Sequence, residues 1–379
     1  MRLHPAVAGG AFALVFAMLV TACGGGGGGS PMMAPVSTTG LTDTALVSDG
    51  VIAAAHTDAN LQNAWGLAAA PNGVFWIADN NSNVSTAYDG TGATQAPLVT
   101  VAAGINGPAN PTGIVFNATN DFVITTGTGS QPAQYLFAGE GGTINGWNQT
   151  VSGTTASVAY DDGAGGAVYK ALALLSNGTA NHLYATDLHN AKIDVFDATF
   201  NKVTLAGTFS DPTIPAGFAP FGIVALNAQL YVTYAKQDAT AHDEVLGAGL
   251  GYVNIFDANG NLVRRFASAG MLNAPWGMAM APAGFGAASG NLLIGNFGDG
   301  AINTFDPMSG NRLGSISLAS GNPLMIPGLW ALVFGNGAAN QPAGTLFYTA
   351  GPSSQTRGVF GSVKQVTSMS PPPCTGYGC

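Results

Sequence analysis

The sequence predicts an all-β protein, on the evidence of its composition, its short apolar segments and an internal repeat. Only 8% of the 379 residues are charged, against about a quarter in an ordinary soluble domain. Glycine occurs 55 times and proline 21 times. The apolar residues form runs too short for the i, i+3, i+4 spacing of an amphipathic helix. Short apolar runs between frequent Gly and Pro turns are typical of β-strands.

The repeat predicts the architecture. Each copy has a short apolar strand near a Gly turn, a Leu-Tyr-Val-like strand ending in a polar residue, and an Ile-x-Val-Phe-Asp strand. In three copies the polar residue and the closing Asp are ten residues apart: Asp79 to Asp89, Asp187 to Asp197, and Asn296 to Asp306. About six copies at intervals of roughly 47 to 60 residues fit four-stranded blades. We therefore predict a single β-propeller over residues 41–365.

The N-terminal end of this region predicts how the ring closes. Residues 44–49 precede the first copy and have no blade of their own. We expect them to pair with the last blade, because a strand added there removes the open edge of the ring.

The segment before the propeller resembles an export signal. Residues 1–22 combine Arg2 with an apolar stretch over 6–20, and Val20-Thr21-Ala22-Cys23 resembles a bacterial lipobox. This predicts lipidation of Cys23 and anchoring in the bacterial cell envelope, and Gly24 favours the outer membrane. The alternative is an ordinary signal peptide with a nearby cysteine. Residues 23–40, rich in Gly, Pro and Ser, are expected to form a flexible tether.

The C-terminal residues 366–379 are expected to form a flexible tail. Cys374 and Cys379 would form a small disulfide loop in an oxidising compartment, or remain free or intermolecular thiols. The formal charge of −9 with scattered Lys and Arg excludes a phosphate-binding surface and makes nucleic acid an unexpected partner. We expect a monomeric domain that meets the membrane only through its lipid.

The repeats resemble those of NHL-type propellers, which read Pro-x-Gly-Ile-Ala, Leu-Tyr-Val-Ala-Asp and Ile-x-Val-Phe-Asp. More narrowly, the chain resembles an uncharacterised bacterial family of exported six-bladed propellers over about residues 41–365. The passages that carry this narrower resemblance are residues 63–67, 110–117, 142–148, 242–244 and 273–277. The resemblance implies a fold and export but no activity, because propellers serve many functions.

Two sets of residues are expected at one end of the ring, where first strands begin and second strands end. The polar set is Asn63, Asp79, Asn110, Glu140, Asp187, Asn273 and Asn296. The aromatic set, expected to rim the channel, is Trp65, Phe221, Trp276 and Trp330. One interpretation is that the polar residues cap their own turns and the aromatic residues pack between blades. The other is that the polar residues converge on a small polar ligand or a Ca²⁺ ion.

An insertion over residues 236–250 interrupts the fourth copy at the same end. It carries Asp238, His242, Asp243 and Glu244 in a chain with few charges. Such a loop is either a solvated excursion or a lid or ion-binding loop over the channel. Among the remaining histidines, only His189 falls in a polar turn at this end, as a turn cap or a base.

No nucleophile or metalloprotease motif is present in the sequence. The first functional hypothesis is therefore an envelope-tethered propeller that binds a protein or a glycan. The alternative is a Ca²⁺-dependent hydrolase or lactonase. In that case Asp79, Asp187 and Asn296 would be ligands, and His189 or His242 a base.

Overall fold

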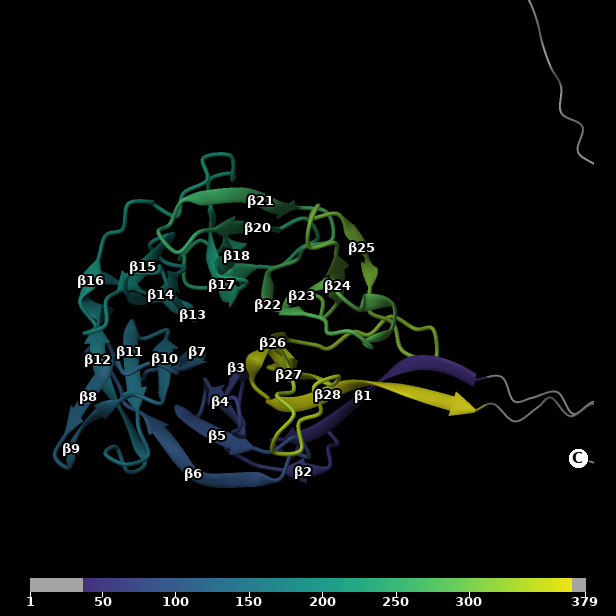
Figure 1. The fold of residues 1–379 in the computed structure, drawn as a ribbon, viewed down its shortest axis with the longest axis horizontal. Helices are drawn as coiled ribbons and strands as arrows, with labels where there is room; N and C mark the ends of the chain where they lie inside the picture. Colours follow the sequence, from purple (N-terminus) through teal and green to yellow (C-terminus); the bar gives the residue numbers. More distant parts are fainter. Residues whose placement is uncertain (1–36, 370–379) are drawn as a thin grey trace, which may run out of the picture. The chain divides into compact units, whose positions relative to one another are not determined.

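Six blades arranged around a central axis make up the computed structural model, which describes residues 37–369 (Figure 1). The predicted signal peptide, Cys23 and the two tail cysteines lie outside the described residues. Each blade is an antiparallel sheet whose first strand faces the axis. The all-β class, the blade number and the four-stranded blade are therefore confirmed.

The first three blades run from residue 64 to residue 203. Blade 1 contains β3 (Ala64–Ala69), β4 (Phe75–Asp79), β5 (Val84–Tyr88) and β6 (Thr94–Val101). Blade 2 contains β7 (Pro111–Phe116), β10 (Tyr135–Gly139), β11 (Thr143–Trp147) and β12 (Thr155–Asp161), with an inserted hairpin of β8 (Val123–Thr126) and β9 (Gly129–Pro132). Blade 3 contains β13 (Tyr169–Ser176), β14 (Asn181–Asp187), β15 (Lys192–Phe196) and β16 (Lys202–Val203).

The remaining blades complete the ring. Blade 4 contains β17 (Phe218–Leu226), β18 (Gln229–Gln237), β20 (Gly251–Phe256) and β21 (Leu262–Ser268), with the short β19 (Glu244–Val245) paired to β18. Blade 5 contains β22 (Pro275–Met280), β23 (Leu292–Asn296), β24 (Ile302–Phe305) and β25 (Arg312–Ser315). Blade 6 contains β26 (Leu329–Phe334), β27 (Leu346–Ala350) and β28 (Val359–Met369).

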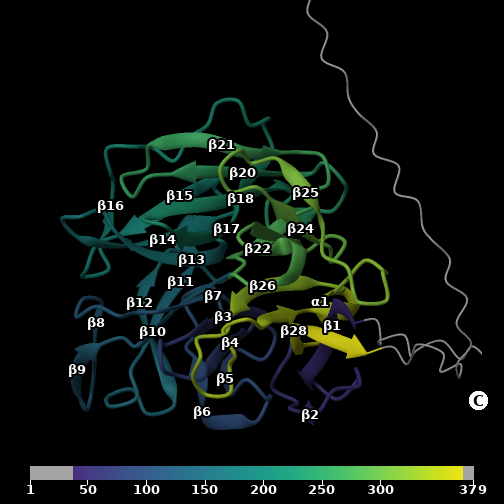
Figure 2. The same ribbon diagram turned by 45° about the vertical axis from the view of Figure 1, so that its right-hand side comes forward.

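The N-terminal strand closes the ring as predicted. Strand β1 (Ser37–Ser48) adds to the outside of β28, and the short β2 (His56–Thr57) pairs with β1 in turn. Both ribbon views show β1 beside β28 (Figure 2). The Tyr348 hydroxyl of β27 donates to Asp43 Oδ1 at 2.8 Å. The last blade thus contains both ends of the propeller, so that unfolding either end opens the ring.

One joint between blades was not expected. The outer strands β6 and β12 pair in parallel, Thr100 with Thr155 and Val101 with Ala156. Blades 1 and 2 therefore share one eight-stranded sheet.

The glycines of the repeated motif let the inner strands approach one another. A Cβ atom on Gly66 would lie 2.4 Å from the carbonyl oxygen of Thr112 in the next blade. On Gly277 it would lie 2.3 Å from the carbonyl oxygen of Trp330. The ring is this narrow because these positions lack a side chain.

The apolar core lies between neighbouring blades rather than within one layer. Between blades 6 and 1, for example, Phe75 packs 4.7 Å from Phe347 and 5.5 Å from Phe360, measured between ring centroids. Among residues 37–369, no helix has the length and apolarity needed to cross a membrane.

Candidate functional site

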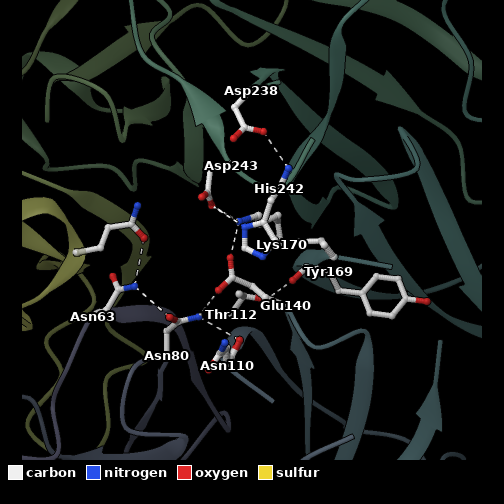
Figure 3. Close-up of polar contacts among 12 residues, drawn as sticks. Asn63, Asn80, Asn110, Thr112, Glu140, Tyr169, Lys170, Asp238, His242 and Asp243 are labelled. Atoms are coloured by element: carbon white, nitrogen blue, oxygen red, sulfur yellow. Dashed lines mark hydrogen bonds and ion pairs between the residues drawn. The ribbon is translucent and has the colours of Figure 1, made fainter. Parts of the chain in front are cut away.

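The site lies at the end of the ring where the inner strands begin. A row of hydrogen-bonded polar side chains crosses this end, which we call the mouth array (Figure 3). Asn63 Nδ2, just before β3, donates to Asn80 Oδ1 at 3.2 Å and to Gln355 Oε1 at 3.3 Å. Asn80 Nδ2 donates to Glu140 Oε2 and to the carbonyl oxygen of Asn110, both at 3.0 Å. The array thus joins blades 6, 1 and 2.

A buried lysine continues the array into blades 3 and 4. The Lys170 ammonium, on β13, forms an ion pair with Glu140 and another with Asp243 Oδ1 at 3.2 Å. Asp243 Oδ1 also lies 3.1 Å from His242 Nδ1. The side chain of Lys170 is fully buried and that of Glu140 is 10% exposed, whereas those of Asp243 and His242 are about half exposed. The array therefore leads from solvent at His242 to a buried charge at Lys170.

The electrostatics of this group keep its charges in place. Burial by itself would lower the pKa of Lys170, but the carboxylates of Glu140, Glu244 and Asp243 outweigh it and raise the pKa. The hydrogen bond to Asp243 raises the pKa of His242, and the same bond, together with Lys170, holds the pKa of Asp243 well below its usual range. Burial raises the pKa of Glu244 to about 7. At neutral pH, Lys170 is charged and Asp243 is ionised.

Beneath the array, aromatic side chains close the centre of the ring. We call Trp65, Phe221, Trp276, Phe297 and Trp330 the aromatic plug. The rings of Trp65 and Trp330 stack at 3.8 Å, and Phe297 stacks on Trp330 at 4.0 Å. The plug lies across the axis, because these residues come from four different blades and contact one another. The four aromatic residues expected at the channel rim are therefore packed together, and all but Trp276 are fully buried.

Two contacts between side chains join the plug to the mouth array. Trp330 Nε1 donates to Asn63 Oδ1 at 3.1 Å, and the Lys170 ammonium lies 5.2 Å from the centroid of the Trp65 ring. A cation over an indole face gains electrostatic attraction. The plug thus lies directly beneath the mouth array and contacts the charged residue of the array, Lys170.

Hydrogen bonds and strand pairing hold the insertion beside the mouth array. It begins as a continuation of β18, since Lys236 pairs with Val245 and Gln237 with Glu244. Asp238 Oδ1 accepts the amide of His242 at 3.0 Å, which fixes the turn that presents the imidazole. Asn273 Oδ1 accepts the amide of Gly247 at 2.7 Å. The role of Asn273 in the structure is to anchor this loop.

The remaining polar residues of the predicted set bond to backbone groups of their own blade or of the segment that leads into it. Asp79 is buried in blade 1, where Oδ2 accepts the amide of Thr86 at 2.9 Å. Asp187 Oδ1 accepts the amide of Val168 at 3.1 Å. Asn296 Nδ2 donates to the carbonyl oxygen of Met271 at 2.7 Å. His189 is exposed and makes no side-chain hydrogen bond to the array. The structure brings Glu140, His242 and Asp243 together but not these four residues.

Lys170, the residue at the centre of the site, was not predicted from the sequence. In the six inner strands, Lys170 occupies the position that precedes the Gly or Ala of the repeat, where the other blades have Trp65, Thr112, Phe221, Trp276 and Trp330. A lone lysine in a register of mainly aromatic residues was a detectable signal. Asn80 and Gln355 carried no such signal, because the repeat does not include their positions.

One group of side chains has the spacing of a metal site. Glu140, His242 and Asp243 each place a donor atom within 4.8 Å of the others. The Lys170 ammonium, however, already forms ion pairs with both carboxylates. Ca²⁺ requires six to eight oxygen ligands, and a fixed cation among the donors opposes a second one. This set of residues does not fit Ca²⁺.

Comparison with solved structures supports the fold. A structural genomics protein of unknown function from Bacteroides thetaiotaomicron aligns with a TM-score of 0.51 at 14% identity, over 87% of this chain and 77% of that one. A catalytically inactive virginiamycin B lyase from Staphylococcus aureus with quinupristin aligns with 0.50 at 14% identity, over 86% and 99%. The aldose sugar dehydrogenase of Escherichia coli gives 0.50 at 13%, over 86% and 99%. At this identity the similarity extends to the fold alone.

Sequence comparison gives a family. No family model matches the chain. The uncharacterised protein R648 of Acanthamoeba polyphaga mimivirus is 34% identical over 349 residues, which cover 91% of this chain and 85% of the relative. The uncharacterised protein L690 of the same virus is 34% identical over 328 residues, 84% of each chain. These relatives are viral, so they do not support the bacterial, exported family that the repeats resemble. The chain belongs to the protein family that includes R648 and L690.

Proposed function

We propose that this protein is a binding propeller whose mouth array recognises a neutral, polyhydroxylated ligand such as a glycan. The observation that supports this is the composition of the array, in which amide, carboxylate, imidazole and ammonium groups from five blades form one hydrogen-bonded row. Hydroxyl groups both donate and accept, so they pair with such a mixed row.

The balance of charge favours a neutral ligand. Lys170 compensates Glu140 and Asp243 from below, and His242 pairs with Asp243 at the surface. A ligand with a strong charge of its own would compete with these internal pairs. A sugar would instead use the free hydrogen-bonding positions of the half-exposed His242 and Asp243.

The mouth array is also preorganised for binding. Every member of the array is held by at least one hydrogen bond or ion pair to its neighbours, and the turn carrying His242 is fixed by Asp238. A site that does not reorganise on binding loses less conformational entropy.

A glycan array tests the proposal. The full chain should bind neutral glycans, and His242→Ala together with Asp243→Asn should weaken that binding at least tenfold. His189→Ala is the matched control, since His189 is also exposed but makes no side-chain bond to the array. Absence of binding to any neutral glycan, or binding unaffected by both array substitutions, would rule the proposal out.

The Ca²⁺-dependent hydrolase is the competing candidate, and the structure disfavours it: Glu140, His242 and Asp243 have the spacing of a metal site, but Lys170 already pairs with both carboxylates. A ligand that binds only the native state raises the midpoint of thermal unfolding. A rise on adding Ca²⁺ that EDTA reverses and Asp243→Asn abolishes would favour this candidate over the glycan site.

The lipid anchor is a separate proposal, supported by the sequence Val20-Thr21-Ala22-Cys23 and the glycine run that follows it. In a bacterial host, Cys23→Ala should release the propeller from the membrane fraction. Unchanged membrane retention would contradict lipidation.

A further inference from the structure

The channel has a second, chemically different opening. A cavity of about 590 Å³ lies around the axis, lined by residues from the middle and the ends of all six inner strands. Pro71 and Ala118, which follow β3 and β7, belong to its wall. The mouth array precedes the inner strands, so this cavity opens at the other end of the ring. We call it the funnel.

The side chains of the funnel offer no hydrogen bonds. All its lining residues are Gly, Ala, Val, Leu, Ile, Pro, Met, Phe or Trp. The one polar atom among these side chains is Trp276 Nε1, and it already donates to the carbonyl oxygen of Lys170 at 3.1 Å. Trp276 also belongs to the aromatic plug, which closes the inner end. The funnel is therefore a blind apolar cavity.

The remaining polar groups of the wall are backbone atoms. Each inner strand pairs with a neighbour on one side only. Backbone N–H and C=O groups on the opposite edge therefore face the axis. A ligand with one or two polar atoms would find partners there, while its body contacted side chains such as Leu67, Ile114 and Met278.

We propose that the funnel binds a neutral, predominantly apolar small molecule. Its volume lies within the roughly 300–1,000 Å³ of typical small-molecule sites. Removing apolar ligand surface from water into a preformed apolar cavity is favourable. An ionised ligand is disfavoured, because no opposite charge lines the wall and its desolvation would not be compensated.

This site is independent of the proposed glycan site. The aromatic plug separates the two, and no residue of the mouth array lines the funnel. Each proposal can therefore fail without the other.

Fluorescence titration with N-phenyl-1-naphthylamine, a neutral apolar dye, tests the funnel. The full chain carrying Cys23→Ala is used throughout, since an acyl chain would itself bind the dye. We expect saturable binding of one dye per protein. The sulfonated analogue 8-anilinonaphthalene-1-sulfonate should bind at least tenfold more weakly.

Two substitutions that fill the cavity locate the binding. Ala69 and Ala225 are half-buried lining residues on opposite parts of the ring. Ala69→Phe and Ala225→Phe should each weaken dye binding at least tenfold while circular dichroism and the thermal midpoint show a folded protein. Ala180→Phe is the control, because it adds the same ring at an exposed turn outside the funnel. His242→Ala should leave dye binding unchanged.

Several results would overturn the proposal. The proposal fails if the protein without a funnel substitution shows no saturable dye binding, or if it binds the two dyes equally. It also fails if dye binding is unchanged in a folded Ala69→Phe or Ala225→Phe variant. An equal loss in Ala180→Phe would show that the dye binds elsewhere.

Discussion

Replacement of Lys170 by methionine tests the buried charge on which the site is built. Methionine keeps most of the length and apolar surface of the lysine stem, so the packing over Trp65 is largely preserved. What is lost is the ammonium between Glu140 and Asp243. Glu140 would then be a nearly buried carboxylate that keeps the hydrogen bond from the Asn80 amide but has lost its counter-charge.

The expected loss of stability follows from how exposed Lys170 and its two carboxylate partners are. Lys170 is fully buried and Glu140 is 10% exposed, and removal of one partner from such a pair costs about 3–5 kcal/mol. Asp243 is 54% exposed, so its separate pair adds less than about 1 kcal/mol. Unfolding entropies of about 2.1 cal/mol/K per residue over roughly 330 residues convert this loss into a fall in Tm of about 4–7 °C.

Urea denaturation and calorimetry of the wild type and Lys170→Met provide the measurement. The double variant Lys170→Met/Glu140→Gln should recover part of the loss, because it removes the unpaired carboxylate and keeps an acceptor for Asn80. Lys364→Met is the control, since Lys364 is exposed and should change stability by less than about 0.5 kcal/mol. A loss below about 1 kcal/mol in Lys170→Met, or no recovery in the double variant, would refute the reasoning.

Three other substitutions test separate contacts. Gly66→Ala should lower the free energy of unfolding in urea by about 1–3 kcal/mol, because its Cβ would lie 2.4 Å from a backbone oxygen of the next blade; Gly314→Ala, with 3.9 Å of room, should be tolerated. Asn63→Gly keeps the left-handed backbone (φ 47°) but leaves the buried Trp330 indole without its acceptor, so the same assay should show a loss of about 1–3 kcal/mol, and no loss would contradict the contact. Burial raises the pKa of Glu244 from 4.5 to about 7, so the folded state binds this proton more tightly than the unfolded state does. The free energy of unfolding that this proton contributes is complete below pH 4.5 and is lost as the pH rises to 7. Glu244→Gln should therefore flatten the fall in Tm over this interval, and an unchanged slope would show that another group titrates.

The site was only partly predictable from the sequence. Placing Glu140 and the insertion at one end of the ring required only the strand order of a blade. Whether a particular polar side chain turns toward the mouth or toward its own turn depends on local backbone geometry. Asp79 and Asp187 share a repeat position, and both bond to backbone amides of their own blades. Glu140, which belongs to a looser copy of the repeat, instead forms an ion pair with Lys170 of the next blade.

The sequence by itself determined the number of blades, the four-stranded blade and closure of the ring by the N-terminal strand. The repeat specifies the blades locally, because each copy contains its own strands and turns. The N-terminal strand has no blade of its own, so it is expected to pair with the open edge of the last blade. Only the tertiary structure decided that the aromatic residues form a plug, that Lys170 lies between Glu140 and Asp243, and that an apolar funnel opens at the far end. These features depend on distances between different blades, which the diameter of the ring sets. That diameter follows from the close approach of inner strands at Gly66 and Gly277, which the spacing of the repeat does not specify.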